Sequence, residues 1–317
     1  YLAAREAVSD QECRLGRLRQ ELVADALATM LSVRTAEALL DAGGKNLVDI
    51  RSALERVELQ QKAGRAAPVE RLRLEARHQE VLETIESWRQ ARTMGLAHLG
   101  ALMNLASPPA GIACDDLPAP ASDGEETAEV LVERAFQERP DLAGAGHQVW
   151  RAERSERAQA RAGKPVLALV AGVNRYGDRD DSRHLGTGFV GVDLSWSLAD
   201  GGQRQGRHQQ ARAGLEAAKS RLDQLKTGVA EQIRRSLAAL QTARSRLERT
   251  KAGLAAAEEA HRIEAMKYEQ GRGTITDLLD AEAALFAARA QDIKAANDLT
   301  AAHIALLLAE GDERLVP

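Results

Sequence analysis

Long stretches without proline are the feature that most limits how this chain can fold. Of its 8 prolines, none falls in residues 1–67 or 166–316, where leucine and alanine recur at three- and four-residue spacing. Proline breaks a helix interior because it lacks an amide hydrogen and clashes with the preceding turn, so these stretches favour uninterrupted helices. Four prolines instead cluster in residues 106–124, together with two glycines, and this composition predicts a linker.

The longest helical pattern runs from about residue 201 to residue 267. At about 1.5 Å per residue, such a helix is roughly 100 Å long. Its apolar stripe is typical of a coiled coil. Gly271 can take the left-handed conformation that ends a helix, and the capping-box pattern from Thr274 to Asp277 then begins a helix that returns to about residue 309. These signals predict a helical hairpin with a tight tip.

The N-terminal third of the chain matches the C-terminal third when it is shifted by 207 positions (271 − 64). Both copies have a Gly-Arg pair at the tip and a Leu-x-x-Glu-Ala sequence in the helix that follows. The matching pairs at and after the tip are Gly64/Gly271, Arg65/Arg272, Leu72/Leu279, Glu75/Glu282 and Ala76/Ala283. We therefore expect two tandem coiled-coil hairpins, the first of which starts inside its long helix.

Two segments before the second hairpin have the pattern of β-strands. Residues 165–176 carry apolar side chains on one face, and residues 187–198 alternate between apolar and small or polar side chains. The apolar side of the second segment includes Val190, Val192, Leu194 and Trp196. Such strands fit a barrel wall between lipid and water, and they also fit a soluble hairpin that packs on helices. Both alternatives need partner strands from elsewhere, because a lone hairpin is marginal in water.

Together these signals predict a mainly α fold with a small β part. A short helix and a second helix are expected on either side of Pro140. The expected segments are a truncated first-repeat hairpin (1–105), a linker (106–124), two further helices (125–163), a transmembrane β-hairpin (164–199), the second-repeat hairpin (200–311) and a tail (312–317).

Composition and motifs exclude several classes of function. A net charge of −4 argues against a nucleic-acid-binding surface or a basic membrane-surface patch. The 2 cysteines lie far apart and the 7 histidines are scattered, so we expect no metal site and no cofactor. The chain also lacks the nucleophile elbow, the phosphate-binding loop and the zinc-protease motif, so we expect no enzyme.

The order of helix, two strands, long helix, glycine tip and return helix resembles the TolC family of outer-membrane efflux proteins. The resemblance covers nearly the whole chain. The matching sequences are Glu138-Arg139-Pro140-Asp141-Leu142, Leu198-Ala199-Asp200-Gly201-Gly202, Tyr268-Glu269-Gln270-Gly271, Asp277-Leu278-Leu279-Asp280-Ala281 and the final Gly311.

The resemblance implies a homotrimer in the outer membrane, in contact with its lipid. Each protomer of the family gives four strands to one shared barrel and two helical hairpins to a periplasmic tunnel, which docks on a periplasmic adaptor protein and an inner-membrane pump. This chain departs from the pattern because the helix and the strand pair before the first long helix are missing. We therefore expect it to be most of a protomer, with two of the four strands.

The resemblance also assigns roles to residues at the tip. Asp277 and Asp280 match the acidic rings of the periplasmic aperture, where crowded carboxylates bind cations. The alternative role of Asp277 is to cap its helix, and the two roles are compatible. Their first-repeat counterparts are Glu70 and Arg73. Tyr268 matches the family's tip tyrosine, which closes the aperture through inter-helix hydrogen bonds; it could also be an ordinary half-buried aromatic.

Four further residues are expected to face the adaptor at the tips: Gly64, Arg65, Gly271 and Arg272. The alternative for both arginines is an ordinary solvated side chain. Trp196 suits an aromatic belt at the membrane interface, or it packs on the ends of helices. Two other functions compete with a channel, namely a soluble coiled-coil scaffold and a periplasmic adaptor protein. An adaptor has one hairpin rather than two, and a cytosolic scaffold has no use for the alternating strand.

Overall fold

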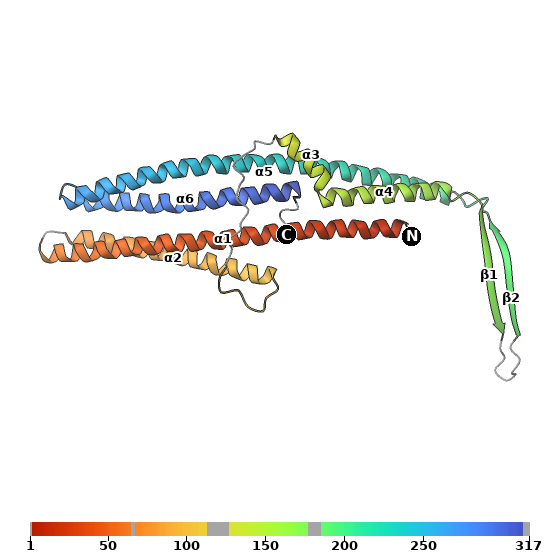
Figure 1. The fold of residues 1–317 in the computed structure, drawn as a ribbon, viewed down its shortest axis with the longest axis horizontal. Helices are drawn as coiled ribbons and strands as arrows, with labels where there is room; N and C mark the ends of the chain where they lie inside the picture. Colours follow the sequence, from red (N-terminus) through yellow and green to blue (C-terminus); the bar gives the residue numbers. More distant parts are fainter. Residues whose placement is uncertain (1, 65–66, 113–126, 177–184, 313–317) are drawn as a thin grey trace. The chain divides into compact units, whose positions relative to one another are not determined.

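The computed structural model describes residues 2–64, 67–112, 127–176 and 185–312, and most of them are helical (Figure 1). None of the described helices is both long enough and apolar enough to cross a membrane. In chain order, the elements are α1 (Leu2–Lys62), α2 (Pro68–Leu102), α3 (Ala128–Glu138), α4 (Pro140–Arg161), β1 (Val166–Tyr176), β2 (Leu185–Ser195), α5 (Gln203–Glu269) and α6 (Ile275–Glu310).

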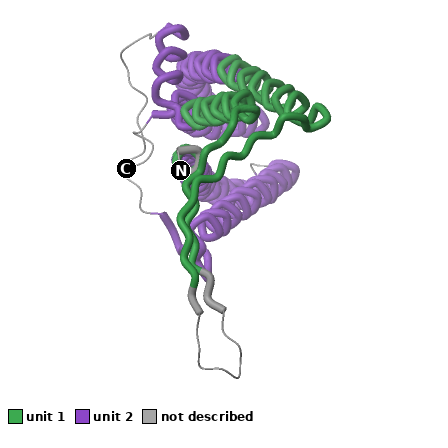
Figure 2. Tube along the Cα trace, turned by 90° about the vertical axis from the view of Figure 1, so that its right-hand side faces the viewer, with its two compact units in different colours: residues 1–14, 141–227 green, residues 15–140, 228–317 purple. Residues whose placement is uncertain are grey.

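The chain divides into two compact units (Figure 2). Unit 1 comprises residues 1–14 and 141–227, and unit 2 comprises residues 15–140 and 228–317. Each unit therefore contains part of α1 and part of α5. Unit 1 also holds the two strands, and unit 2 holds both hairpin tips.

In unit 2, helices α1 and α2 form one hairpin, and α5 and α6 form another (Figure 1). Their apolar side chains recur at helical spacing and meet in a core that joins both hairpins. Ile275 of α6 packs there against residues of the first hairpin, and the rings of Trp88 and Phe286 are 5.7 Å apart. We call this contact the inter-hairpin seam. Its buried members are Ile50, Val57, Leu74, Val81, Ile85 and Ile275.

Both long helices end at a glycine with positive φ, which is +70° at Gly64 and +68° at Gly271. A residue with a Cβ rarely adopts this backbone conformation. The amide of Gly271 donates to the carbonyl of Tyr268 (3.0 Å), and that of Arg272 donates to the carbonyl of Lys267 (2.8 Å). This pair of bonds is the Schellman ending of a helix. The two predicted hairpins and their glycine tips are thus confirmed.

Polar side chains hold α4 against the first turns of α1 and of α5 in unit 1. The carboxylate of Asp10 is 2% exposed, accepts a hydrogen bond from Nε2 of Gln148 (3.1 Å) and pairs with Arg14 (3.3 Å). Nε2 of His208 lies 2.8 Å from a carboxylate oxygen of Glu156. These contacts position α4 and α5 side by side, and the strands connect the two helices.

The strands β1 and β2 pair antiparallel over their whole length. The alternating residues of the two strands lie directly opposite each other, so one face of the ribbon is apolar. The facing pairs on that side include Leu167–Leu194, Leu169–Val192 and Ala171–Val190. The other face is mixed: Ala168 lies there opposite Asp193, and Val170 and the exposed Phe189 lie there opposite Gly191 and Gly172. The predicted alternation is therefore confirmed.

The second strand is shorter than predicted at its end, because β2 stops at Ser195. Ser195 pairs with Val166, and the residue before Val166 is Pro165, which has no amide hydrogen with which to extend the ladder. The assignment of Trp196 to the strand is therefore corrected. Its indole Nε1 instead donates to the carbonyl of Gly163 (3.3 Å) just beyond α4, in line with the alternative that it packs on helix ends.

Candidate functional site at the hairpin tips

Asp277 caps the first turn of α6. Its amide donates to the Thr274 hydroxyl (3.2 Å), and its carboxylate accepts from the amide (3.4 Å) and the hydroxyl (2.7 Å) of the same threonine. This arrangement is a capping box, so the predicted cap is confirmed. Asp277 and Asp280 are both exposed one turn apart at the tip, which leaves their carboxylates accessible to ions. Their role in an acidic ring stays a prediction.

Tyr268 joins the two hairpins beside the tips. Its ring is half-buried against the seam, and its hydroxyl donates to Oε1 of Gln60 on α1 (3.4 Å). Burial and, next, the neighbouring Glu70 raise the pKa of the phenol, which keeps it a neutral hydrogen-bond donor. A second bond across the seam runs from the Arg73 guanidinium to the hydroxyl of Thr276. Side-chain hydrogen bonds from Tyr268 and Arg73 therefore help to hold the described tips together.

The glycines that we expected to contact a partner are accessible. Gly64, Gly271 and Arg272 are all exposed. Arg65 lies outside the described residues. The accessible tip of the second hairpin therefore presents a glycine and a cationic side chain next to the two carboxylates of α6.

A buried polar cluster crosses the seam, and the sequence analysis did not predict it. Nδ2 of Asn46 on α1 donates to Oε1 of Glu282 on α6 (3.1 Å), and Asn46 is only 6% exposed. Burial is the largest cause that raises the pKa of the Glu282 carboxyl, and the negative charge of Asp49 raises it further. Arg77, Asn46 and Arg56 lower this pKa. Glu282 matches Glu75 in the repeat. Its contact with Asn46 joins residues 236 positions apart, so no local sequence pattern predicts it.

Arg139, from one of the matched sequences, is a buried structural centre of unit 2. It is 4% exposed, and its Nη1 donates to the carbonyl of Ala309 in the last turn of α6 (2.7 Å) and to Oε1 of Gln232 on α5 (3.1 Å). A Cβ added to Gly311 would lie 2.6 Å from Cγ of Arg139, and Gly311 has a φ of +80°. Arg139 and Gly311 therefore fit together at the end of α6. This contact explains physically why an arginine and a glycine stand at these two positions of the matched sequences.

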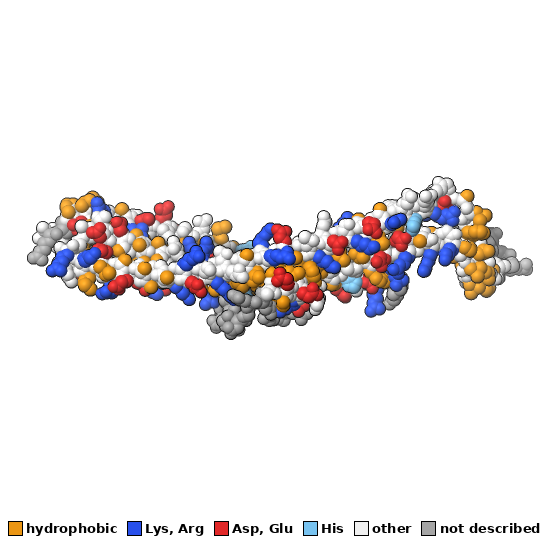
Figure 3. Space-filling view, turned by 90° about the horizontal axis from the view of Figure 1, so that it is seen from above, with side chains coloured by type: hydrophobic (Ala, Val, Ile, Leu, Met, Phe, Trp, Pro, Cys, Tyr) orange, Lys and Arg blue, Asp and Glu red, His pale blue; other side chains and the backbone are white. Residues whose placement is uncertain are grey.

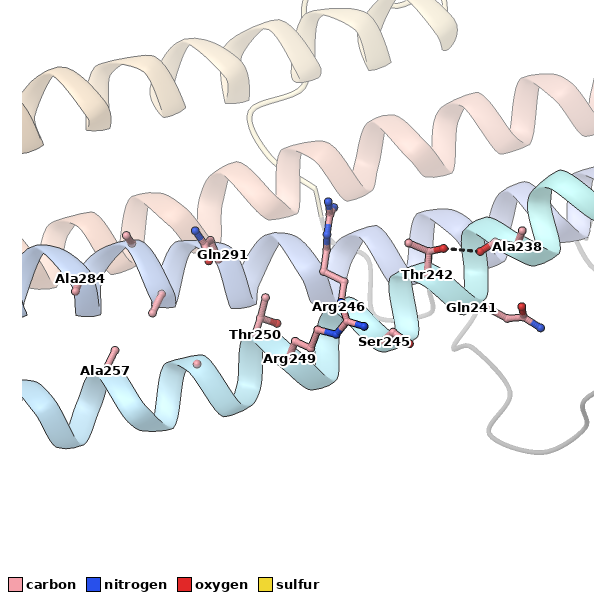
Figure 4. A pocket seen from close by; sticks show the side chains of 13 residues that line it. Ala238, Gln241, Thr242, Ser245, Arg246, Arg249, Thr250, Ala257, Ala284 and Gln291 are labelled. Carbon is pink, nitrogen blue, oxygen red and sulfur yellow. Dashed lines mark hydrogen bonds between the residues drawn. The ribbon is translucent and has the colours of Figure 1, made fainter.

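An open groove of about 920 Å³ runs along the second hairpin between α5 and α6 (Figure 4). Ala257 of α5 and Ala284 of α6 line it, and Arg246 and Arg249 lie along α5 between Ala238 and Ala257. Arg246 pairs with Asp298 of α6 (3.1 Å). Small side chains let another helix approach the backbone closely, so the groove has room for a packed helix.

The apolar face of the ribbon is exposed along its whole described length. Leu169, Val173 and Val190 are each 77–80% exposed, and Val192 and Leu194 are each 66% exposed. The apolar side chains that gather on the strands are seen in Figure 3. Exposed aliphatic side chains in such a continuous band mark a surface that another apolar phase covers.

Residues 131–312 match the family model of the outer membrane efflux protein. The chain belongs to this family. The match covers more than half of the chain and includes α4, both strands, the second hairpin and the Arg139 centre. The chain is therefore part of an outer-membrane efflux channel, and the family is one of transport proteins rather than of enzymes. The resemblance to TolC-like efflux proteins is confirmed.

Solved outer-membrane channels have the same fold. The chain is similar to the outer-membrane channel OprN (TM-score 0.82, 18% identity), covering 98% of this chain and 70% of that one. It is similar to VceC of Vibrio cholerae (TM-score 0.82, 17% identity), covering 98% of this chain and 74% of that one. It is also similar to the open state of MtrE of Neisseria gonorrhoeae (TM-score 0.83, 18% identity), covering 98% of this chain and 70% of that one. No curated protein matches the chain in sequence.

The family leaves two of the earlier alternatives without support. Neither a soluble coiled-coil scaffold nor a periplasmic adaptor has this order of elements.

Within the described residues, no group of three or more histidine, cysteine, aspartate or glutamate side chains is arranged to hold a metal ion.

Proposed function

We propose that the chain is part of a protomer of a homotrimeric exit duct, which passes substrates from an inner-membrane pump and a periplasmic adaptor to the outside of the cell. The observation that carries this proposal is the apolar face of the β1–β2 ribbon. Its aliphatic side chains are more than 60% exposed at Leu167, Leu169 and Val192. Lipid contact removes such a surface from water, and the opposite face, which carries Asp193 and Gly191 beside Val170 and Phe189, is left for the lumen.

The ribbon also needs further strands to be stable. In the described part of the chain, β1 and β2 pair only with each other, so each has an unpaired edge. Unpaired backbone groups are costly in lipid, and closure into a barrel removes both edges. We therefore infer that the ribbons of three protomers take part in one shared barrel, with the helical hairpins forming the periplasmic tunnel below it.

The internal repeat supports a ring of hairpins made from several copies. Shifted by 207 positions (257 − 50), four groove residues of the second hairpin correspond to four seam residues of the first hairpin. The pairs are Gly253/Asn46, Ala257/Ile50, Ala284/Arg77 and Ala288/Val81. In the first hairpin these positions lie against α6. In the second hairpin the same positions line the open groove.

The same shift supports a proposal for what fills the groove. The segment of α6 that packs in the seam contains Leu279 and corresponds to the start of α2, where Leu72 is 55% exposed. Further along α2, the exposed Glu83 and Glu86 have the opposite charge to Arg246 and Arg249 of the groove. We infer that α2 of a second copy packs in this groove, and that repetition of the contact closes the trimer.

Filling the groove is expected to prevent assembly. Ala284→Trp places a large side chain where the second copy packs, so we expect the concentration at which trimers dissociate to rise at least about tenfold. Because trimer dissociation depends on the square of concentration, this equals about 2.7 kcal/mol per trimer. Sedimentation of the detergent-solubilised protein measures this. Ala239→Trp, at an exposed site outside the groove, is the matched control. Equal trimer stability in both variants would place the contact between copies elsewhere.

We assign Asp277 and Asp280 to the acidic ring at the periplasmic aperture. Both are exposed on the same face of α6 next to the tip, and three copies of each converge in the proposed trimer. Tyr268 and its bond to Gln60 help to hold the aperture closed. Gly64, Arg65, Gly271 and Arg272 are the residues that we assign to contact with the adaptor.

Neutralising the ring is expected to weaken block by trivalent cations. Asp277→Asn together with Asp280→Asn removes six negative charges from the trimer while an amide oxygen still caps α6, so we expect at least about tenfold weaker block in single-channel recordings. Glu248→Gln, an exposed carboxylate on α5 away from the tip, should leave the block unchanged. Unchanged block in the double variant would rule out the ring assignment.

Fractionation of the full-length parent protein, followed by mass determination of the detergent-extracted species, tests the proposed function as a whole. A trimer in the outer-membrane fraction is the expected result. A monomer or a dimer in a soluble fraction would contradict it, because the ribbon would then have neither lipid nor partner strands.

A further inference from the structure

We propose that Glu282 and Asn46 form a proton-dependent latch across the inter-hairpin seam, in which the protonated carboxyl of Glu282 donates to Oδ1 of Asn46 and loss of that proton loosens the seam. The inference deepens the proposed function by adding regulation of the duct, and only its consequence for conductance rests on that function. The latch itself is a property of two helices in one unit.

The unpaired oxygen of Asn46 is the first observation behind the latch. Nδ2 of Asn46 donates to Oε1 of Glu282 (3.1 Å), but its Oδ1 is buried and has no donor in the described structure. Buried polar atoms are normally hydrogen-bonded. An ionised carboxylate can only accept, whereas a carboxylic acid has one O–H to donate. A proton on Glu282 therefore supplies the donor that Oδ1 lacks, and it makes a two-bond pair of amide and acid.

The surroundings of Glu282 are the second observation. Its side chain lies at the seam, next to buried Asn46, and burial is the largest cause that raises the pKa of its carboxyl. Within the described residues, Nε of Arg77 is also buried without an acceptor, while Nη1 of the same residue is paired with Glu80 (2.6 Å). Arg77 and Arg56 thus only partly offset the cost of burying the negative charge of ionised Glu282. The charged groups that act on Glu282 are Asp49 and Arg56 of α1 and Arg77 of α2. On α5, His261 and Glu264 are also half-buried, and Glu264 pairs with Lys267.

The latch belongs to the seam and is not a general feature of these hairpins. At the repeat-related positions, Gly253 and Ala284 stand in place of Asn46 and Arg77. The counterpart of Glu282 is Glu75, whose side chain is 43% exposed and pairs with Arg71 one turn away (2.8 Å). Glu75 therefore provides a matched control in the same chain.

The sign of the pH effect follows from linkage. In an opened seam, the Glu282 carboxyl is solvated and has the ordinary pKa of glutamate; in the closed seam its pKa is raised. The closed form thus binds more protons between these two values. The free energy that holds the seam closed is largest below the ordinary pKa, and it falls as the pH rises towards the raised one. The proton is taken from solvent on closing and is returned to solvent on opening.

Spin-label distances across the seam test the latch in the full-length protein. Labels at Ser52 on α1 and Glu259 on α5, which are exposed and repeat-related, report the separation of the hairpins. Cys13 and Cys114 are first replaced by serine, and labelled protomers are diluted with unlabelled ones. We expect the wild-type distance to lengthen and broaden between about pH 4 and about pH 8, a range that starts near the ordinary pKa of glutamate.

The variants separate the latch from a general pH effect. Glu282→Gln mimics the protonated acid and should keep the short distance at every pH, and Asn46→Ala should keep the long, broad distribution at every pH. Glu75→Gln should respond to pH like the wild type. A pH response of Glu282→Gln equal to that of the wild type, or a wild type without any response, would overturn the latch.

A protein that conducts no ions would contradict the proposed function, while the label distances would still decide on the latch.

Discussion

Replacing Arg139 by alanine is expected to lower the free energy of unfolding by about 3 kcal/mol or more. The substitution leaves the carbonyl of Ala309 and the amide oxygen of Gln232 without their buried donor, and it removes a side chain that is 4% exposed. Loss of one member of a buried, hydrogen-bonded charged network typically destabilises by about 3–5 kcal/mol. Thermal unfolding followed by the helical circular-dichroism signal should show a midpoint lower by roughly 5–10 °C.

An exposed arginine supplies the control for this effect. Arg235 on α5 is 78% exposed and pairs with Glu231 one turn away. We expect Arg235→Ala to change the stability by less than about 0.5 kcal/mol. Arg139→Lys should lie between the two, because lysine keeps the charge but lacks the planar guanidinium that serves two acceptors at once. Equal midpoints for Arg139→Ala and Arg235→Ala would show that the buried network does not hold the helices together.

A charge on the apolar face of the ribbon is expected to abolish membrane insertion. Val190 is 77% exposed on that face, in the middle of the ribbon opposite Ala171. A lysine near the midplane of the bilayer costs about 2–4 kcal/mol in such strands, and a trimer carries three copies. We expect Val190→Lys to reduce the amount of trimer in the outer-membrane fraction at least about tenfold.

The opposite face of the same strand gives the comparison. Asp193 lies on the other face of the ribbon, opposite Ala168. Because that side faces the lumen in the proposed barrel, Asp193→Lys should insert nearly as well as the wild type and should change only the ion selectivity. If both lysine variants inserted equally well, Val190 would not contact lipid.

Local sequence patterns determined the elements and the family. The proline-free spans, the capping box at Thr274 and the glycines at Gly64 and Gly271 act between residues a few positions apart, so they can be read directly along the chain. The alternation of β2 was equally readable, since strand side chains alternate with a period of two. The end of β2 was missed because the ladder depends on the partner strand, where Pro165 removes the donor opposite Trp196.

The tertiary structure alone decided which polar residues meet. Asn46 and Glu282 are 236 positions apart, and Arg139 and Ala309 are 170 positions apart. The repeat makes Glu282 and Glu75 equivalent in sequence. Their partners differ, because Glu282 bonds to Asn46 across the seam and Glu75 pairs with Arg71 on its own helix. No local propensity encodes such contacts, since they depend on which helix faces lie together after packing. The sequence by itself therefore determined the helices, tips, strands and family, whereas the packing of the hairpins decided where charge is buried and where a groove stays open.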